Sequence, residues 1–409
     1  MTTIRQHLVF ISVLLVTLLG CAGIALPYPI LAPLFMDGGV TGLNSFMGLP
    51  AEILLGIALA VYPFGILIGA SFIGALSDSL GRKKVLVWTL FISIIGYFVS
   101  AYAIVTESFM LFTLSRFFTG LCEGNVSIAR AIALDLGETI DKTRAMSLIG
   151  AATFLGWFVG PLAGGYLAEY GSEVAFEAGG IAILVCMLLA MVAIKETHVV
   201  ENDKPFMTLV KSHNSFHLLK IPLVFGMFIF QLCFTLGLNA FYEFYPVWLV
   251  TERDHTPKDI GHITAVMTVF MTLTSLFVVT KLKRVVGLKV ALVGALVVCS
   301  ILMGVLPFTT AMAMLAIFSL TGVCISIYNG LLPVFMSDIA PDVGNGALMG
   351  LITVTFCISN TMIALVGSFA LQFGAAVPMY MGCGFVLLSA ILLAQYMLKL
   401  PVYEKAGNH

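Results

Sequence analysis

The stretch GALSDSLGRKKVL, residues 74–86, is informative about the fold because a related stretch occurs about half a chain later. That second stretch, TKLKRVVGLKVAL at residues 280–292, has a glycine, a lysine and a leucine at matching places. A second pair of similar stretches is YPIL, which begins at Tyr28, and YPVW, which begins at Tyr245. Each match is short, but together they indicate a duplicated unit. The sequence therefore predicts two related halves.

The composition around these stretches predicts a membrane protein. Apolar residues make up 60% of the 409 residues and charged residues only 10%, whereas soluble domains have about 25% charged residues. A bilayer core about 30 Å thick needs about 20 apolar residues per helix. Twelve segments meet this need: residues 8–35, 52–76, 84–105, 109–135, 144–169, 176–195, 221–250, 259–281, 286–307, 311–338, 345–373 and 376–399. We therefore expect an all-α polytopic protein with twelve transmembrane helices in two six-helix bundles.

The positions of the basic residues predict the orientation. Most of the 20 Lys and Arg lie at the two ends of the chain or in alternate loops, which places both termini in the cytoplasm by the positive-inside rule. The longest polar stretch, within residues 196–220, is then a cytoplasmic linker. It separates a bundle of residues 1–195 from a second bundle of residues 221–409, which ends in a short cytoplasmic tail.

The quoted stretch predicts a conformational latch in a cytoplasmic loop. Gly74 and Gly81 allow close backbone approach and a tight turn. Asp78 is placed to accept hydrogen bonds from Arg82 or from a helix N-terminus, and Lys83 adds a second basic group. Such a cluster would lock the two bundles in one state and release them in another. The alternative is a basic loop that only fixes the topology.

A glycine-rich stretch, GWFVGPLAGG at residues 156–165, predicts close helix packing. Gly156, Gly160 and Gly164 recur at intervals of four and form one smooth helix face, which Gly165 extends. Pro161 removes a backbone donor and bends the helix. The expected role is a hinge or seal between helices, although ordinary packing of small residues explains the same pattern.

The stretch RFFTGLCEGNVSIAR, residues 116–130, places charges inside a predicted span. Arg116, Glu123 and Arg130 are seven residues apart, so they share one stripe of the helix. Burial disfavours an ionised Glu123 and a nearby Arg116 favours it, so a small change could release a proton. The alternative is a static pair. We interpret Arg130 as structural, through snorkelling or pairing with Asp135.

A second acid, Glu243, lies in the predicted span NAFYEFYPVWL among aromatic rings. A carboxylate among rings would bind a lipophilic cation or carry a proton. The alternative is an interfacial aromatic belt with a water-exposed acid. Further polar groups lie within spans and would line a cavity or bond between helices: Asn125, Asn239, Asn329 and Asn360.

These motifs resemble the major facilitator superfamily, in its drug:proton antiporter branch. GALSDSLGRKK is similar to the family's signature loop, with Ser79 where a basic residue is frequent. RFFTG resembles the motif whose arginine, here Arg116, is associated with proton coupling, and GWFVGPLAGG resembles the antiporter motif. ARAIALDL and the KETH ending of the sixth span resemble tetracycline-type efflux pumps. The resemblance also implies that Asp338 joins the Arg82 cluster, whereas Glu123 stands where related exporters carry a small residue.

Together these features predict a secondary transporter that exports small organic or drug-like molecules in exchange for protons by alternating access. One alternative is a proton-coupled importer or facilitator of a small metabolite, and anionic metabolites are among the candidates. Another is a non-transporting receptor or scaffold on the same fold. The sequence has no P-loop and no metal-ligand spacing, so we expect no enzyme activity, cofactor, metal or nucleic-acid partner. The expected state is a monomer in a bacterial inner membrane, with substrate and protons as partners.

Overall fold

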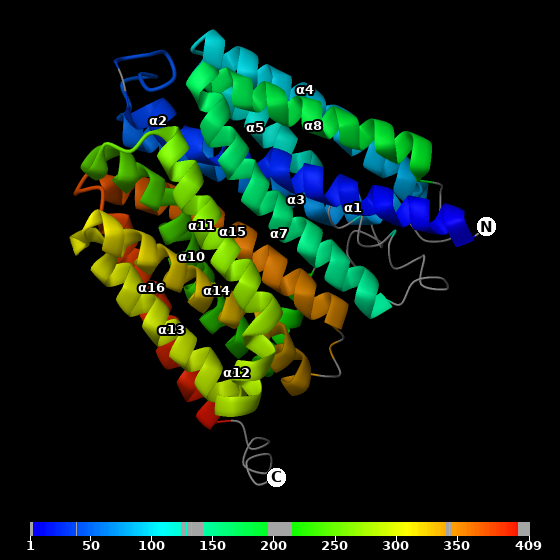
Figure 1. The fold of residues 1–409 in the computed structure, drawn as a ribbon, viewed down its shortest axis with the longest axis vertical. Helices are drawn as coiled ribbons and strands as arrows, with labels where there is room; N and C mark the ends of the chain where they lie inside the picture. Colours follow the sequence, from blue (N-terminus) through cyan, green and yellow to red (C-terminus); the bar gives the residue numbers. More distant parts are fainter. Residues whose placement is uncertain are drawn as a thin grey trace. The chain divides into compact units, whose positions relative to one another are not determined.

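The computed structural model describes residues 3–37, 39–123, 128, 132, 142–194, 215–340, 343 and 345–399, and most of these residues lie in helices (Figure 1). The α-helices are α1 (Thr3–Ala25), α2 (Tyr28–Met36), α3 (Ala51–Leu80), α4 (Arg82–Val105), α5 (Phe109–Cys122), α7 (Lys142–Leu167), α8 (Ser172–Ala193), α10 (Pro222–Arg253), α11 (Pro257–Phe277), α12 (Val279–Val286), α13 (Leu288–Val305), α14 (Ala311–Ile339), α15 (Asn345–Leu371) and α16 (Val377–Leu398). Three 3₁₀ turns accompany them: η1 (Ala168–Tyr170), η2 (Ser215–Lys220) and η3 (Leu306–Phe308).

Each predicted span contains a helix, so the predicted fold class is confirmed. Within the described residues, 11 helical segments are long and apolar enough to cross a membrane. The fourth predicted span corresponds to α5, which is described only as far as Cys122. The first predicted span is interrupted between α1 and α2, where Pro27 and Pro29 remove two backbone donors.

The stretch quoted above is mostly helical, which corrects the predicted loop. Gly74 lies inside α3, which continues to Leu80. The turn is reduced to Gly81, whose φ of 99° favours glycine, and α4 begins at the next residue. Gly287 makes the same turn between α12 and α13, with φ 81°. The two halves therefore repeat a helix–glycine–helix turn, as the similarity of residues 74–86 and 280–292 predicts.

The helices fall into two compact units. The first unit comprises residues 1–214 and 246–265, and the second comprises residues 215–245 and 266–409. The end of α10 and the start of α11 thus belong to the first unit. The division into bundles of residues 1–195 and 221–409 stays a prediction.

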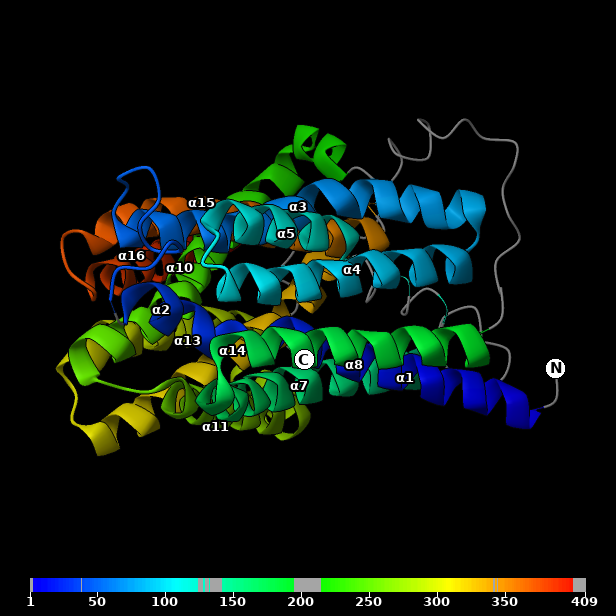
Figure 2. The same ribbon diagram turned by 90° about the horizontal axis from the view of Figure 1, so that it is seen from above.

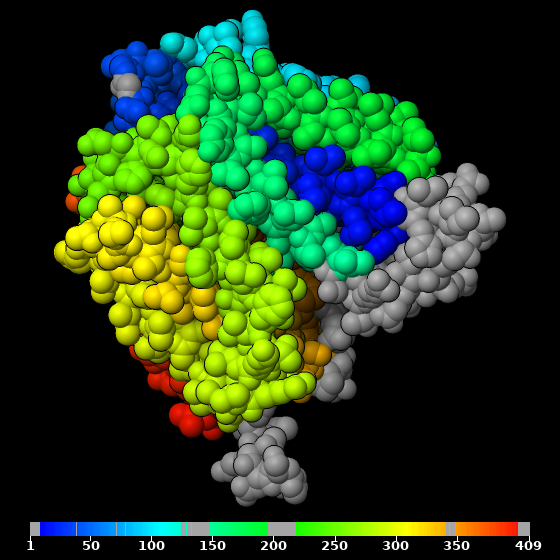
Figure 3. Space-filling model, in the orientation of Figure 1, coloured from blue at the N-terminus to red at the C-terminus, as the bar shows by residue number. Residues whose placement is uncertain are grey.

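The first unit contains two pairs of packed helices and a helix, α1, that lies between two others. α4 packs along α8, and α3 packs along α5 (Figures 1 and 2). α1 packs against both α7 and α8, and Figure 3 shows it at the surface between them. Phe112 and Phe176, from α5 and α8, are fully buried, and their ring centroids lie 5.6 Å apart. These contacts fix the positions of α3, α4, α5 and α8 around Arg116.

The second unit has α13 in contact with both α14 and α16 (Figure 1). α10 provides buried aromatic residues along its length. Phe234 stacks on Tyr328 of α14, and the two ring centroids lie 3.9 Å apart. α10 and α14 are therefore held together by rings as well as by the polar contacts described below.

Candidate functional site

Arg116 is buried in the first unit and is surrounded by aromatic rings. Its side chain is only 5% exposed. Its guanidinium carbon lies 4.1 Å from the ring centroid of Tyr62, 5.9 Å from that of Tyr97 and 5.8 Å from that of Phe176. Ring faces attract a cation and partly replace lost hydration. One guanidinium nitrogen, Nη1, has no hydrogen-bond partner among the described residues.

Glu123 completes this cluster at the C-terminal end of α5. Its backbone N–H donates to the carbonyl of Gly120 at 3.1 Å. Its carboxylate lies within electrostatic range of Arg116 and beside the Tyr62 hydroxyl. The buried Oε1 atom of Glu123 and the Tyr62 hydroxyl both lack a hydrogen-bond partner in the described part of the chain. A carboxyl group, a guanidinium and a hydroxyl therefore gather in one place, and each has one polar atom without a hydrogen-bond partner among the described residues. We name Tyr62, Arg116 and Glu123 the α5 cluster.

Glycines on the facing helices bring the α5 cluster together. A Cβ atom at Gly65 of α3 would lie 2.5 Å from the carbonyl oxygen of Phe117. A Cβ atom at Gly120 of α5 would collide with the carbonyl oxygen of Tyr62. Only glycine allows the two backbones to approach this closely. The close approach puts Tyr62 next to the charged stripe of α5.

Glu243 lies in the second unit and is held by an amide. The Nδ2 atom of Asn360, on α15, donates to Glu243 Oε1 at 3.0 Å. Asn239, one turn earlier on α10, donates from Nδ2 to the carbonyl of Phe356 at 3.3 Å. The Oδ1 atoms of Asn239 and Asn360 are buried without a hydrogen-bond partner within the ranges described. Because both amide nitrogens face acceptors, both Oδ1 atoms remain as acceptors.

Two polar residues that the sequence reasoning missed extend this site along α10. Gln231 accepts a hydrogen bond from the Tyr328 hydroxyl at 3.0 Å. The hydroxyls of Thr235 and Ser359 lie 2.6 Å apart. These residues follow one helix face at intervals of four, which we name the α10 polar face: Gln231, Thr235, Asn239 and Glu243. The spacing of four residues between these polar side chains could have revealed the face from the sequence. Hydroxyl and amide residues are less conspicuous than charged ones among many apolar residues.

The aromatic residues near Glu243 are buried. Phe241, Phe244 and Tyr245 are fully buried, and Trp248 is 2% exposed. An interfacial belt would expose such rings to the membrane surface. The geometry therefore favours an internal polar site over the belt interpretation of Glu243.

The other predicted residues have varied positions. Asn329 and Asp338 are exposed on α14, and Arg82 is half-buried at the start of α4. Lys83 donates from Nζ to the carbonyl of Met191 at 2.7 Å. Asp78 lies in α3, but its side chain is outside the described part. Asn125 and Arg130 lie outside the described residues, as does Asp135. The predicted latch therefore stays a prediction.

The glycine face of α7 lies against α1. Cβ atoms at Gly156 and Gly160 would collide with atoms of α1, and a Cβ atom at Gly164 would collide with the backbone of Leu26, the residue that follows α1. A Cβ atom at Gly165 would lie 2.7 Å from the carbonyl oxygen of Pro257, next to the start of α11. Pro161 lies inside α7. This face therefore brings α7 into backbone contact with two other helices.

Both sites place polar and ionisable side chains on apolar helices. Charged residues inside spans are costly and are typical of substrate and proton pathways. Within the ranges listed above, no three His, Cys, Asp or Glu residues gather to hold a metal ion. The apolar helices, the two units and the buried charges define a polytopic membrane transporter. The chain belongs to the Major Facilitator Superfamily, whose sequence pattern matches residues 8–364, and the predicted family is thereby confirmed.

Related sequences include two bacterial proteins named for drug resistance and a human protein named for the same superfamily. Multidrug resistance protein 2 of Bacillus subtilis is 23% identical over 82% of this chain and 84% of its own length. The class H tetracycline resistance protein of Pasteurella multocida is 27% identical over 46% of this chain and 44% of its own length. Human major facilitator superfamily domain-containing protein 10 is 36% identical, but the match covers only 37% of this chain and 35% of that protein.

Solved structures share the fold across most of the chain. The human organic anion transporter MFSD10 aligns with a TM-score of 0.65 at 20% identity and covers 95% of this chain and 99% of that one. A D-xylose-proton symporter aligns with a TM-score of 0.75 at 13% identity and covers 95% of this chain and 97% of that one. At these identities the likeness concerns the fold alone.

Proposed function

We propose that this transporter exports small organic or drug-like molecules in exchange for protons by alternating access. The names of two relatives support this proposal, since one is a multidrug resistance protein and another a tetracycline resistance protein. In this proposal the chain is a monomer in a bacterial inner membrane with both termini in the cytoplasm, and its partners are the substrate and protons.

The observation that carries the proposal is the α5 cluster. Burial disfavours an ionised carboxylate and a nearby positive charge favours it, so the protonation of Glu123 is proposed to depend on the position of Arg116. The unpartnered Oε1 of Glu123 and Nη1 of Arg116 leave both groups free to change partners. A small shift of α5 against α3 would weaken the attraction and favour proton uptake by Glu123. The reverse shift would release the proton.

The α10 polar face is proposed to bind the substrate. The Oδ1 atoms of Asn239 and Asn360 are acceptors without a donor, and Glu243 adds a carboxylate beside them. These groups suit a substrate that donates hydrogen bonds, such as a protonated amine. In the alternative within this proposal, Glu243 also carries a proton, and the substrate displaces it.

The remaining predicted residues are proposed to control the conformational change. Gly81, Arg82 and Lys83, with Asp78 and Asp338, would form the latch on the cytoplasmic side. Arg130 would support it. The glycine face of α7 would act as a hinge or seal, since its backbone contacts leave no room for larger side chains.

Flux measurements in proteoliposomes test the proposal. Wild-type protein should drive accumulation of ethidium or tetracycline when a pH gradient is imposed in the antiport direction. Glu123→Gln should lower this flux at least tenfold, whereas the matched control Glu177→Gln, an exposed acid on α8, should retain it. Full proton-driven flux in Glu123→Gln would overturn the proposal.

A second candidate is an importer or facilitator of an anionic metabolite. Arg116 favours it, because its Nη1 has no hydrogen-bond partner among the described residues and would serve a carboxylate or phosphate. The 36% identity to human major facilitator superfamily domain-containing protein 10 also supports it, because the solved structure of MFSD10 is that of an organic anion transporter. Uptake of an organic anion such as p-aminohippurate, lost in Arg116→Gln but kept in Glu243→Gln, would favour this candidate over the exporter.

A further inference from the structure

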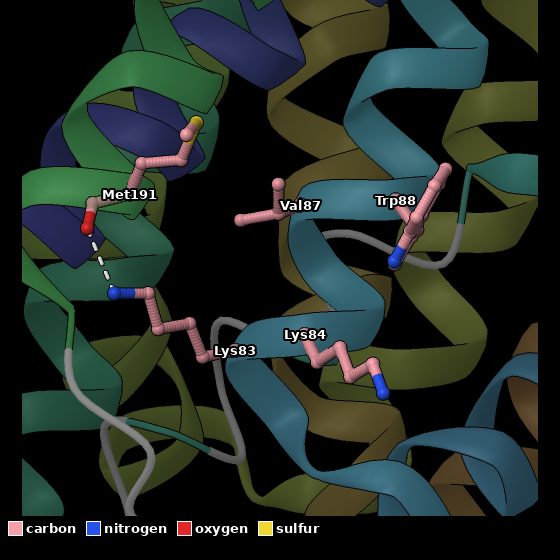
Figure 4. Close-up of a pocket in the computed structure, with 5 residues that line it drawn as sticks. All are labelled: Lys83, Lys84, Val87, Trp88 and Met191. Atoms are coloured by element: carbon pink, nitrogen blue, oxygen red, sulfur yellow. Dashed lines mark hydrogen bonds between the residues drawn. The ribbon is translucent and has the colours of Figure 1, made fainter.

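A hollow on the surface of the first unit lies between the first turns of α4 and the end of α8. It has a volume of about 340 Å³ and is lined by Lys83, Lys84, Val87, Trp88 and Met191 (Figure 4). Figure 4 shows Lys83 and Val87 on the side of α4 toward Met191, and Lys84 and Trp88 on the side away from it. The bond from Lys83 Nζ to the Met191 carbonyl ties one wall to the other at 2.7 Å. None of the lining residues is acidic.

Two apolar stripes lead away from this hollow. The exposed apolar residues of α4 include Trp88, Phe91, Ile95 and Phe98, and those of α8 include Val185, Leu188 and Val192. Each set recurs at intervals of three or four, so each forms one stripe on its helix. α4 and α8 pack side by side along their lengths (Figures 1 and 2). Each stripe is therefore an exposed apolar surface of its helix, and the stripe of α4 begins at Trp88 in the hollow.

We propose that this hollow binds the headgroup phosphate of an anionic phospholipid, with the acyl chains along the two stripes. The charge of the hollow selects the lipid, because Lys83 and Lys84 are basic and none of the described residues that line it is acidic. Trp88, 59% exposed, is a residue typical of the headgroup level of a membrane. The positive-inside prediction places the hollow in the cytoplasmic leaflet. This inference depends on the membrane-spanning fold and not on the transport proposal.

The expected selectivity is modest and measurable. A lysine near an anionic membrane surface changes lipid affinity by about fivefold. The hollow should therefore prefer phosphatidylglycerol over phosphatidylcholine by about fivefold for each lysine that engages the phosphate. A lipid that only solvates the apolar stripes would show no such preference.

Quenching of tryptophan fluorescence by brominated lipids tests the site on the intact protein. The protein is placed in phosphatidylcholine nanodiscs that contain increasing fractions of brominated phosphatidylglycerol or brominated phosphatidylcholine. We expect half-maximal quenching at an at least fivefold lower fraction of the brominated phosphatidylglycerol. The chain has 3 tryptophans, and Trp88→Phe should remove the selective component. Equal quenching by the two lipids, or selective quenching that persists in Trp88→Phe, would overturn the proposal.

Two lysine variants separate the hollow from general surface charge. Lys84→Gln should reduce the preference for phosphatidylglycerol about fivefold. The matched control Lys281→Gln removes an exposed lysine of α12 in the other unit and should leave the preference unchanged. If both variants reduce the preference equally, nonspecific attraction explains the binding and the site is refuted.

Discussion

The two units bury polar groups in different ways. In the α5 cluster the charged atoms themselves lack hydrogen bonds: Nη1 of Arg116 and Oε1 of Glu123 have no partner among the described residues. On the α10 polar face the carboxylate of Glu243 accepts from Asn360, and the unpartnered atoms are neutral amide oxygens. A buried charge without hydrogen bonds responds strongly to a proton or a small movement. The difference suggests that the first unit senses protons and the second holds the substrate.

Of the changes considered, removal of Arg116 should have the largest effect, and the effect should be on the stability of the first unit. Arg116→Leu leaves Glu123 buried without its positive neighbour, and a buried charge that has lost its compensating charge destabilises the folded protein. We expect a large fall in thermal stability, measured by the melting of detergent-purified protein. Arg116→Lys keeps the charge and should recover much of the loss. Equal stability of the leucine variant and wild type would show that the pair is not coupled.

The glycine contacts under the α5 cluster should rank second. Gly65→Ala places a Cβ atom 2.5 Å from the Phe117 carbonyl oxygen, and such overpacking costs about 2 kcal/mol. Because α5 must then move away from α3, proton coupling should weaken more than substrate binding. Gly294 of α13 has open space around it, so Gly294→Ala is the control and should change neither. Unchanged coupling in Gly65→Ala would separate the close helix contact from the proton site.

Loss of the Glu243 charge should affect the substrate rather than the proton. A hydrogen bond to a charged group contributes about 1.5 kcal/mol, so Glu243→Gln should weaken substrate affinity about tenfold. The measurement is equilibrium binding of a radiolabelled substrate to purified protein. Glu252→Gln, an exposed acid on the same helix, should bind normally. If Glu243→Gln binds normally but loses coupling, the roles assigned to the two units must be exchanged.

The hydroxyl of Tyr328 should have the smallest effect. Tyr328→Phe leaves the buried Gln231 Oε1 without this donor, which costs about 1 kcal/mol of stability. Transport should stay within about twofold of wild type, because this part of the α10 polar face is satisfied by hydrogen bonds. Tyr380→Phe, at an exposed tyrosine, should not shift the melting temperature. A tenfold loss of transport in Tyr328→Phe would extend the substrate site along the helix.

Much of the fold was predictable because a membrane imposes long apolar helices. The twelve spans, the repeated turn at Gly81 and Gly287 and the family followed from local patterns. The length of α3 beyond residue 76 was not predictable, since Asp78 and the serines around it are compatible with both a loop and the end of a helix.

The sites were predictable in part. Arg116, Glu123 and Glu243 stand out because ionisable residues are rare inside spans. Their partners do not stand out, because Tyr62 is far from Arg116 in sequence and only the packing of α3 on α5 brings them together. Asn360 likewise meets Glu243 only through the packing of α15 near α10. Sequence can thus identify a buried charge but not the residue that will stabilise it.

The most direct test of Glu123 as the proton carrier is the count of protons released when substrate binds to purified protein in a weakly buffered solution. We expect wild-type protein and Glu243→Gln, at saturating substrate, both to release protons. We expect Glu123→Gln to bind substrate and to release no proton. Proton release from Glu123→Gln equal to that from wild type would refute the proton role of Glu123, because the proton would then come from a group outside the α5 cluster.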